Sequence, residues 1–176
     1  MNNGPGLILA ALAAAALAGC QSMSSSEPAL ASAGLAATKG NKTVGEVTFE
    51  QMGDKVRVTA QVIGLKPDQE HGFHIHEVGD CSSGDGMSAK GHFNPFGKPH
   101  GHATSGERHA GDMPNLKADK SGRARLTVDL DVITVTPGPA SIIGRGVIVH
   151  AQPDDYTSQP VGNAGARMAC GVIKAN

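Results

Sequence analysis

The chain has 176 residues, with 15 Lys and Arg against 16 Asp and Glu and a formal net charge of −1. This length suits one domain with a sizeable core and not two, and the charge balance argues against a nucleic acid partner held by bulk charge. The 24 glycines and 10 prolines predict a domain rich in loops. Since the chain has only 4 Phe, 1 Tyr and no Trp, its core must be built from Val, Ile, Leu and Ala.

The first 20 residues contain no charged side chain, and residues 7–18 form an apolar stretch. Such a stretch is too short to cross a membrane comfortably and ends in small residues, which is typical of a secretory signal peptide. The motif Leu-Ala-Gly-Cys that ends at Cys20 is similar to the lipobox of bacterial lipoprotein precursors. We therefore expect a signal peptide at residues 1–19, a lipid on Cys20 and a Ser-rich flexible tether at residues 20–31. The alternative is an ordinary signal peptide cleaved nearby, with Cys20 incidental.

These expectations place the mature protein in the periplasm or cell envelope, attached to a membrane by its lipid. Gln21 rather than Asp follows the lipidated Cys, which favours the outer membrane. With Cys20 used as the anchor, Cys81 and Cys170 remain in a chain exported to a compartment where disulfides persist. We expect these two cysteines to be joined, and the compartment disfavours the alternative of two buried free thiols.

Alternation of apolar and polar residues predicts most of the strands. Residues 46–63 predict a β-hairpin with Val47 and Phe49 on one face, and residues 123–132 predict a second half-buried strand. Shorter strands are predicted at residues 32–38, 73–76, 146–150 and 170–174. Because no segment after the signal peptide has a helical period, we expect residues 32–176 to form an all-β domain. Its predicted architecture is an antiparallel Greek-key β-sandwich or flattened barrel of the immunoglobulin-like kind.

A long stretch between Gly79 and Lys117 is crowded with Gly, Ser, His and Pro and has no periodicity. A connection of this length inside a compact domain is either functional or a sign of a wrong assignment. Something other than secondary structure must hold it in place.

Histidine is the unusual residue of this sequence, because seven of the eight lie in residues 71–109 and the eighth is His150. On a strand, His74 and His76 project from the face opposite Phe73 and Ile75, where two imidazoles can act as metal ligands. Taken alone, a pair of this kind is more often an exposed polar stripe than a site.

The long loop supplies a second group of donors, His92, His100, His109 and Asp112. Three imidazoles and one carboxylate suit tetrahedral Zn²⁺. Nitrogen donors on the nearby strands, with no thiolate or thioether beside them, suit Cu(II) in a tetragonal geometry, and His150 can complete that set.

Four motifs in order along the chain resemble the copper/zinc superoxide dismutases. They are HGFHIHE at residues 71–77, GHFNP at 91–95, ERHAGD at 107–112 and GNAGARMACG at 162–171. The similarity covers nearly all of the chain after the tether and keeps the spacing of the family. It implies an enzyme that disproportionates superoxide to dioxygen and hydrogen peroxide, with one copper and one zinc per subunit.

The resemblance also implies the ligands of each metal. Copper would be bound by His74, His76, His92 and His150, and zinc by His92, His100, His109 and Asp112. His92 would bridge the two ions as an imidazolate, because one ring can span two cations only when both of its nitrogens are deprotonated.

Further residues receive roles from the same resemblance. Asp154 would join two of the metal ligands, His74 and His100. Arg167 would attract and orient the superoxide anion near copper without giving up a proton. The disulfide between Cys81 and Cys170 would hold the loop beside that arginine.

Two other functions use the same residues. An exported metal-buffering protein would keep the ligands without turnover, but a buffer needs no anion guide such as Arg167. A zinc hydrolase needs an open water position on zinc, which four protein ligands would not leave.

Some single residues also have alternative roles. Asp154 could be a solvated carboxylate and Arg167 a surface charge. His71 and His102 have no predicted ligand role. Monomer and homodimer both stay open, because exported bacterial members include both.

Overall fold

The computed structural model describes Met1 and residues 30–176. The expected signal peptide, Cys20 and nearly all of the expected tether lie outside the described residues. The strands are β1 (Leu30–Ala37), β2 (Val44–Met52), β3 (Lys55–Ile63), β4 (Glu70–His71), β5 (Phe73–His76), β6 (Leu116–Lys117), β7 (Ala124–Leu130), β8 (Gly146–His150), β9 (Arg167–Val172) and β10 (Lys174–Ala175). A 3₁₀ helix, η1, spans Met87–Ala89. No helix in the described part of the chain has the length and apolar character needed to cross a membrane.

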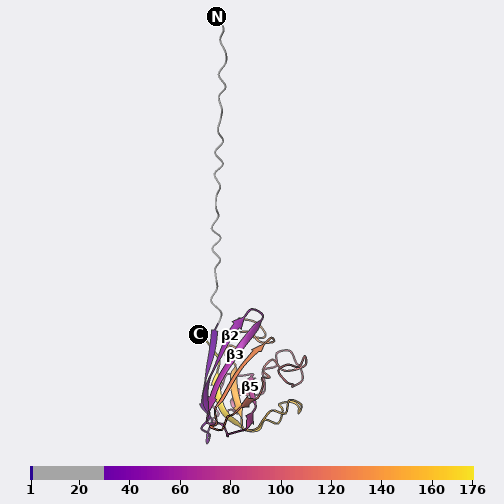
Figure 1. Cartoon of the computed structure of the whole chain (residues 1–176). Coiled ribbons are helices and arrows are strands. Elements are labelled where there is room, and N and C mark those ends of the chain that lie inside the picture. Colours follow the sequence, from indigo (N-terminus) through magenta and orange to yellow (C-terminus); the bar gives the residue numbers. More distant parts are fainter. Residues whose placement is uncertain (2–29) are drawn as a thin grey trace.

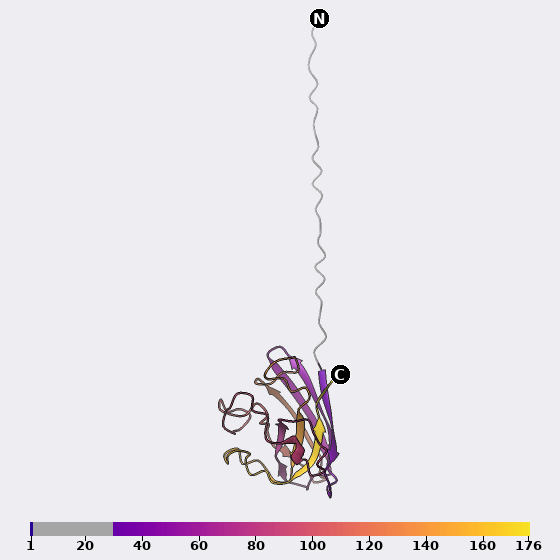
Figure 2. The same cartoon turned by 180° about the vertical axis from the view of Figure 1, so that it is seen from behind.

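The main sheet is antiparallel and has the strand order β5-β8-β9-β1-β2-β3-β7, with β10 beside β1. The chain crosses from one side of this sheet to the other after β3, after β5 and after β7, which confirms the Greek-key type of connection. The sheet curls around its core, and the long connections project from one side of it (Figures 1 and 2). The prediction of an all-β domain is confirmed.

The predicted hairpin is β2 and β3. Val47 and Phe49 are fully buried and pair with Ala60 and Val58 on the neighbouring strand. Alternate residues of β2 and β3 therefore fill the core, while the polar residues between them face solvent.

Several predicted strand boundaries differ from the structure. The strand predicted at residues 170–174 is β9, which begins at Arg167 and ends at Val172. β1 begins at Leu30, inside the segment expected to be a tether, because Leu30 and Ala31 pair with β2 and Ala31 is fully buried. β7 ends at Leu130 rather than at residue 132. Asp131 leaves the sheet there and forms an ion pair with Arg108 of the long loop.

All four residues of β5 are buried. Phe73 and Ile75 belong to the hydrophobic core, whereas His74 and His76 lie on the other face. That face is covered by the long loop, since Asp112 and His92 make isolated bridges with these two histidines. The histidine pair is therefore an interior feature and not an exposed polar stripe.

Gly111 brings the loop against β5. Its backbone accepts a hydrogen bond from Ile75 N–H and donates one to the carbonyl of Phe93. A β-carbon on Gly111 would collide with the carbonyl oxygen of Ile75, so only glycine permits this approach. The close packing holds the adjacent Asp112 over the strand.

The predicted disulfide between Cys81 and Cys170 is confirmed, with 89 residues of sequence separation and a Cα–Cα distance of 5.8 Å. It ties the start of the long loop to β9. Replacing both cysteines with serine should lower the free energy of unfolding of the metal-free protein by about 4 kcal/mol, because the bond removes loop-closure entropy from the unfolded chain. Urea unfolding of the variant and the oxidised parent measures the difference. Equal stabilities would contradict the expectation.

Candidate metal centre

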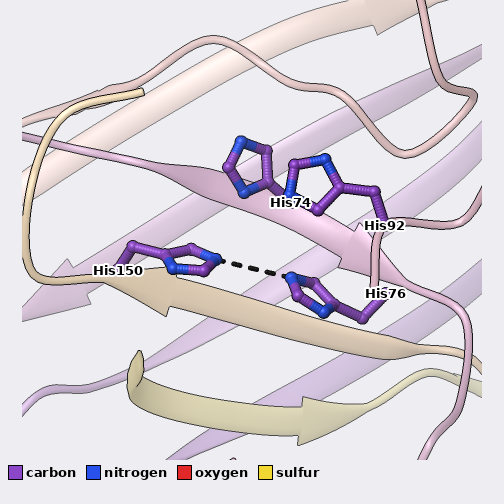
Figure 3. Close-up of side chains that lie close together, drawn as sticks. All are labelled: His74, His76, His92 and His150. Carbon is purple, nitrogen blue, oxygen red and sulfur yellow. Dashed lines mark hydrogen bonds between the residues drawn. The ribbon is translucent and has the colours of Figure 1, made fainter. Parts of the chain in front are cut away.

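The first donor cluster consists of His74, His76, His92 and His150. One ligand atom from each lies within 4.8 Å of the others, and all four residues are buried. Figure 3 shows β5 contributing two rings, the end of β8 a third and the long loop the fourth. The Nε2 atoms of His76 and His150 lie 3.4 Å apart.

Hydrogen bonds on the far side of each ring determine which nitrogen faces the cluster. His76 Nδ1 donates to the carbonyl of Lys90 at 2.8 Å, and His150 Nδ1 donates to the carbonyl of Gly165 at 3.1 Å. The Nε2 atoms of both rings are therefore unprotonated and point inward when the rings are neutral. This is the state in which imidazole binds a metal.

In His74 and His92, one ring nitrogen contacts a carboxylate and the other faces the cluster. His74 Nε2 lies 2.7 Å from the Asp154 carboxylate, and His92 Nδ1 lies 2.8 Å from Asp112. His74 Nδ1 and His92 Nε2 are buried with no hydrogen-bond partner in the described structure. Leaving a buried polar atom unpaired costs about 1–3 kcal/mol. These unpartnered nitrogens fit a cation bound by four imidazoles, a donor set that suits copper.

The second cluster surrounds one carboxylate oxygen and consists of His92, His100, His109 and Asp112. Asp112 Oδ1 lies 2.8 Å, 3.0 Å and 3.3 Å from the Nδ1 atoms of His92, His100 and His109. Asp112 Oδ2 accepts hydrogen bonds from the backbone N–H of Gly101 and of His109. Three nitrogens and one oriented oxygen match the tetrahedral donor set of zinc.

Asp154 lies between the two clusters. Its Oδ2 is 2.7 Å from His74 Nε2, and its Oδ1 is 2.9 Å from His100 Nε2. The three side chains are fully buried. Asp154 therefore fixes one ring of each cluster at the same time, and it is not a solvated loop carboxylate.

Burial keeps the first cluster neutral. Removal from water lowers the pKa of His74, His76 and His150, and it lowers the pKa of His92 to about 4. Neighbouring imidazoles lower these pKa values further. At neutral pH the inward nitrogens are consequently free of protons.

His100 behaves in the opposite way. Burial by itself would lower its pKa, but the hydrogen bonds to Asp112 and Asp154 outweigh this effect and raise the pKa to about 9. Burial likewise would raise the pKa of both carboxyls, yet the hydrogen bonds from the histidines hold them well below the usual range. Without metal, the second cluster therefore holds the Asp112 carboxylate and a protonated ring, with the Asp154 carboxylate next to that ring.

Arg167 is the first residue of β9 and is half-buried. Its Nη1 donates to the carbonyl of Gly86 at 2.6 Å, and its Nη2 donates to the carbonyl of Lys90 at 2.5 Å. The same Lys90 carbonyl accepts the hydrogen bond from His76. The guanidinium thus lies beside the first cluster and is oriented by the backbone that orients one of its rings.

Sequence reasoning missed this role of Lys90, since a backbone carbonyl carries no residue-specific signal. Lys90 has a φ of 61°, a conformation that residues other than glycine rarely adopt. The packing of the loop holds the Lys90 carbonyl in place despite the conformational energy that this backbone angle costs.

The remaining two histidines belong to neither cluster. His71 is buried and its Nδ1 donates to the carbonyl of His150 at 2.9 Å. His102 lies in an exposed turn, where its Nδ1 is 2.8 Å from the Thr104 hydroxyl. Neither ring contributes a donor atom to the two clusters.

Comparison with known proteins gives a consistent result. The family described as copper/zinc superoxide dismutase matches residues 43–173. Superoxide dismutase [Cu-Zn] 1 of Aquifex aeolicus (strain VF5) is 43% identical over 140 residues, which cover 77% of this chain and 82% of the relative. Superoxide dismutase [Cu-Zn] 2 of the same organism is 41% identical over 157 residues, covering 87% and 91%. The superoxide dismutase [Cu-Zn] of Paramecium bursaria Chlorella virus 1 is 44% identical over 135 residues, covering 73% and 71%.

A solved structure of the clock protein EA4 matches with a TM-score of 0.78 at 41% identity, over 86% of this chain and 97% of that one. The family match, the relatives and the two histidine clusters agree with one another. The chain belongs to the copper/zinc superoxide dismutase family.

Proposed function

We propose that this protein is an enzyme that disproportionates two superoxide anions and two protons to dioxygen and hydrogen peroxide. The observation that carries the proposal is the sharing of His92 between the two clusters, one nitrogen facing each. His74 Nδ1 and the Nε2 atoms of His76, His92 and His150 would hold copper. The Nδ1 atoms of His92, His100 and His109 and Asp112 Oδ1 would hold zinc.

Copper, when bound, supplies the one-electron redox chemistry that the reaction needs. The protein supplies protons and orientation. His92 Nε2 takes up a proton in one half of the cycle and returns it as peroxide forms, with solvent providing the other. Asp154, Asp112 and the second cluster keep the His92 ring in place between these events.

Arg167 binds and orients the substrate. Its guanidinium always carries a charge, and the carbonyls of Gly86 and Lys90 hold it beside His76. A fixed positive charge at this place attracts an anion and positions it for reaction. This feature supports an enzyme over a metal-buffering protein, which has no use for an anion guide. The four donors of the second cluster also favour a structural zinc over a hydrolytic one.

Substitution of His92 by alanine should lower copper-dependent dismutation by about 100-fold or more, since it removes both the shared ligand and the proton carrier. Circular dichroism should show the fold retained. His102→Ala changes a histidine outside both clusters and should keep the activity of the parent. Full activity in His92→Ala would refute the role of this ring.

Arg167→Ala should lower kcat/KM for superoxide about 10-fold, and its rate should depend less on ionic strength than that of the parent, because a charge that steers the substrate is lost. Arg167→Lys keeps the charge and should recover part of the rate. Stopped-flow assays from low to high salt measure both effects. An unchanged rate in Arg167→Ala would show that the arginine is only a surface charge.

Zinc binding to the metal-free protein should release about one proton per ion at pH 7, because His100, with its raised pKa of about 9, must lose the proton on Nδ1 to bind the metal. The release should fall towards zero as the pH rises above about 9, where the ring is already neutral. Calorimetry in buffers of different ionisation enthalpy measures the proton count. Zinc uptake without proton release at pH 7 would contradict the assignment of His100.

We also propose that a lipid on Cys20 attaches the enzyme to a membrane of the cell envelope, with the catalytic domain in the periplasm and outer-membrane sorting favoured by Gln21. The uncharged apolar leader and the lipobox-like motif support this proposal. There the enzyme would protect the envelope against external superoxide. Monomer and homodimer both stay open, and light scattering of residues 21–176 distinguishes them.

Expressed in a bacterium that processes lipoproteins, the full chain should sediment with the outer membrane and incorporate labelled fatty acid. Cys20→Ser should abolish the label and leave the enzyme unanchored. An unlabelled parent that is released as a soluble protein would favour the ordinary signal peptide.

A further inference from the structure

The side-chain amide of Gln159 is paired with the backbone of His100. Gln159 Oε1 accepts a hydrogen bond from His100 N–H at 2.9 Å, and Gln159 Nε2 donates to the His100 carbonyl at 2.9 Å. One side chain thus satisfies both backbone polar groups of a residue whose ring belongs to the second cluster. The two residues are 59 positions apart, so this pairing joins two separate loops.

The loop that carries Gln159 is closed on itself. Asp155 N–H donates to the carbonyl of Gly162 at 2.9 Å, and Gly162 N–H donates to the carbonyl of Ser158 at 2.7 Å. The Asp155 carboxylate accepts further hydrogen bonds from the backbone N–H groups of Thr157 and Ser158 and from the Asn163 amide. Gln159 is therefore presented by a preorganised turn, which reduces the entropy lost when its amide binds the other loop.

Glycine at position 162 allows this turn to close over the interior. Its φ is +66°, and a β-carbon there would collide with the Asp154 carboxylate and lie 2.6 Å from His100 Nε2. The turn therefore packs directly on the contact between Asp154 and His100.

Together these contacts hold His100 from two directions. Asp154 Oδ1 fixes the Nε2 end of the ring at 2.9 Å, while Gln159 fixes the backbone from which the ring projects. Next to them, the ring of Tyr156 meets the ring of His102 edge-on with centroids 4.5 Å apart. With its backbone and its Nε2 atom both restrained, His100 can present only Nδ1 to the second cluster.

We propose that Gln159 is a positioning residue for zinc: its amide clamps the backbone of His100 so that the Asp154–Gly162 turn and the zinc-binding loop open and close as one unit. The inference rests on the zinc assignment made above. A coupling of this kind is reciprocal, so zinc stabilises the turn as much as the turn stabilises bound zinc. Zinc can then leave only when the clamp opens.

The test compares two Gln→Met substitutions in the same loop. Gln159→Met removes both hydrogen bonds while keeping the length of the side chain. Gln152→Met makes the same chemical change at an exposed residue whose side-chain amide has no hydrogen-bond partner among the described residues. Each protein is loaded with zinc and copper and mixed with a chromogenic zinc chelator.

Zinc release from Gln159→Met should be about 10-fold faster than from the parent, as is typical when a partner of a metal ligand is lost. Release from Gln152→Met should match the parent. Gln159→Met should lower the melting temperature of the zinc-loaded protein more than that of the metal-free protein, because a positioning role acts on bound metal, whereas a merely structural role would lower both equally. Parent-like zinc release in Gln159→Met, or an equal effect of both substitutions, would overturn the proposal.

Amide hydrogen exchange gives a second readout that does not depend on catalysis. The His100 N–H donates to Gln159, so its exchange in the zinc-loaded protein should be faster in Gln159→Met and unchanged in Gln152→Met. Exchange of the His100 N–H as slow in Gln159→Met as in the parent would contradict the proposed role of Gln159. If the parent released zinc as expected but had no dismutase activity, the proposed function would fail while the clamp would stand.

Discussion

The imidazole of His92 belongs to two donor sets at once, with Nδ1 2.8 Å from Asp112 and Nε2 buried with no hydrogen-bond partner among the described residues. A ring can do this only if its plane and its position are both fixed, because a rotation that suits one set spoils the other. The rest of the centre meets that constraint. Asp154 spans the two sets, and Gly111 brings the loop that carries Asp112 against β5.

The fold meets the same constraint by combining a rigid sheet with loops that have little regular structure. β5 and β8 contribute three histidines from adjacent positions of one sheet, so their spacing depends on strand geometry. The other donors come from the long loop and depend on close backbone packing, the disulfide and hydrogen bonds between loops. Metal binding should consequently stabilise the loops far more than the sheet, since ligands held by the metal no longer rely on those contacts alone.

Charge is distributed unevenly between the two clusters. The four histidines of the first are neutral at neutral pH because burial lowers their pKa values, whereas the second holds the ionised Asp112 carboxylate and a protonated His100. Bound as proposed, zinc would replace a proton in an ionic network, and copper would occupy a site of neutral nitrogens. Arg167 lies at the edge of the neutral cluster, where its positive charge attracts an anion, and the carboxylate whose charge acts on it is that of the exposed Asp85.

Sequence alone determined the strands of the hairpin and the residue types of both clusters. Apolar alternation has the period of a strand, and histidines concentrated in the middle of the chain serve few purposes other than metal binding. The two-residue strands β4, β6 and β10 were not predicted, because two residues are too few to show a period. The start of β1 at Leu30 was not predicted, because the residues before it have a composition that is also typical of a tether.

Only the tertiary structure decided which nitrogen of each histidine faces which cluster. That choice depends on the partner of the opposite nitrogen, such as the carbonyl of Lys90 for His76, and every residue type has such a carbonyl. The pairing of Gln159 with His100 could not be predicted from the sequence either, since no sequence pattern indicates which residue a loop glutamine will bind. Donor identity is a property of side chains and can be read along the chain, whereas donor orientation arises from contacts between loops that the sequence separates.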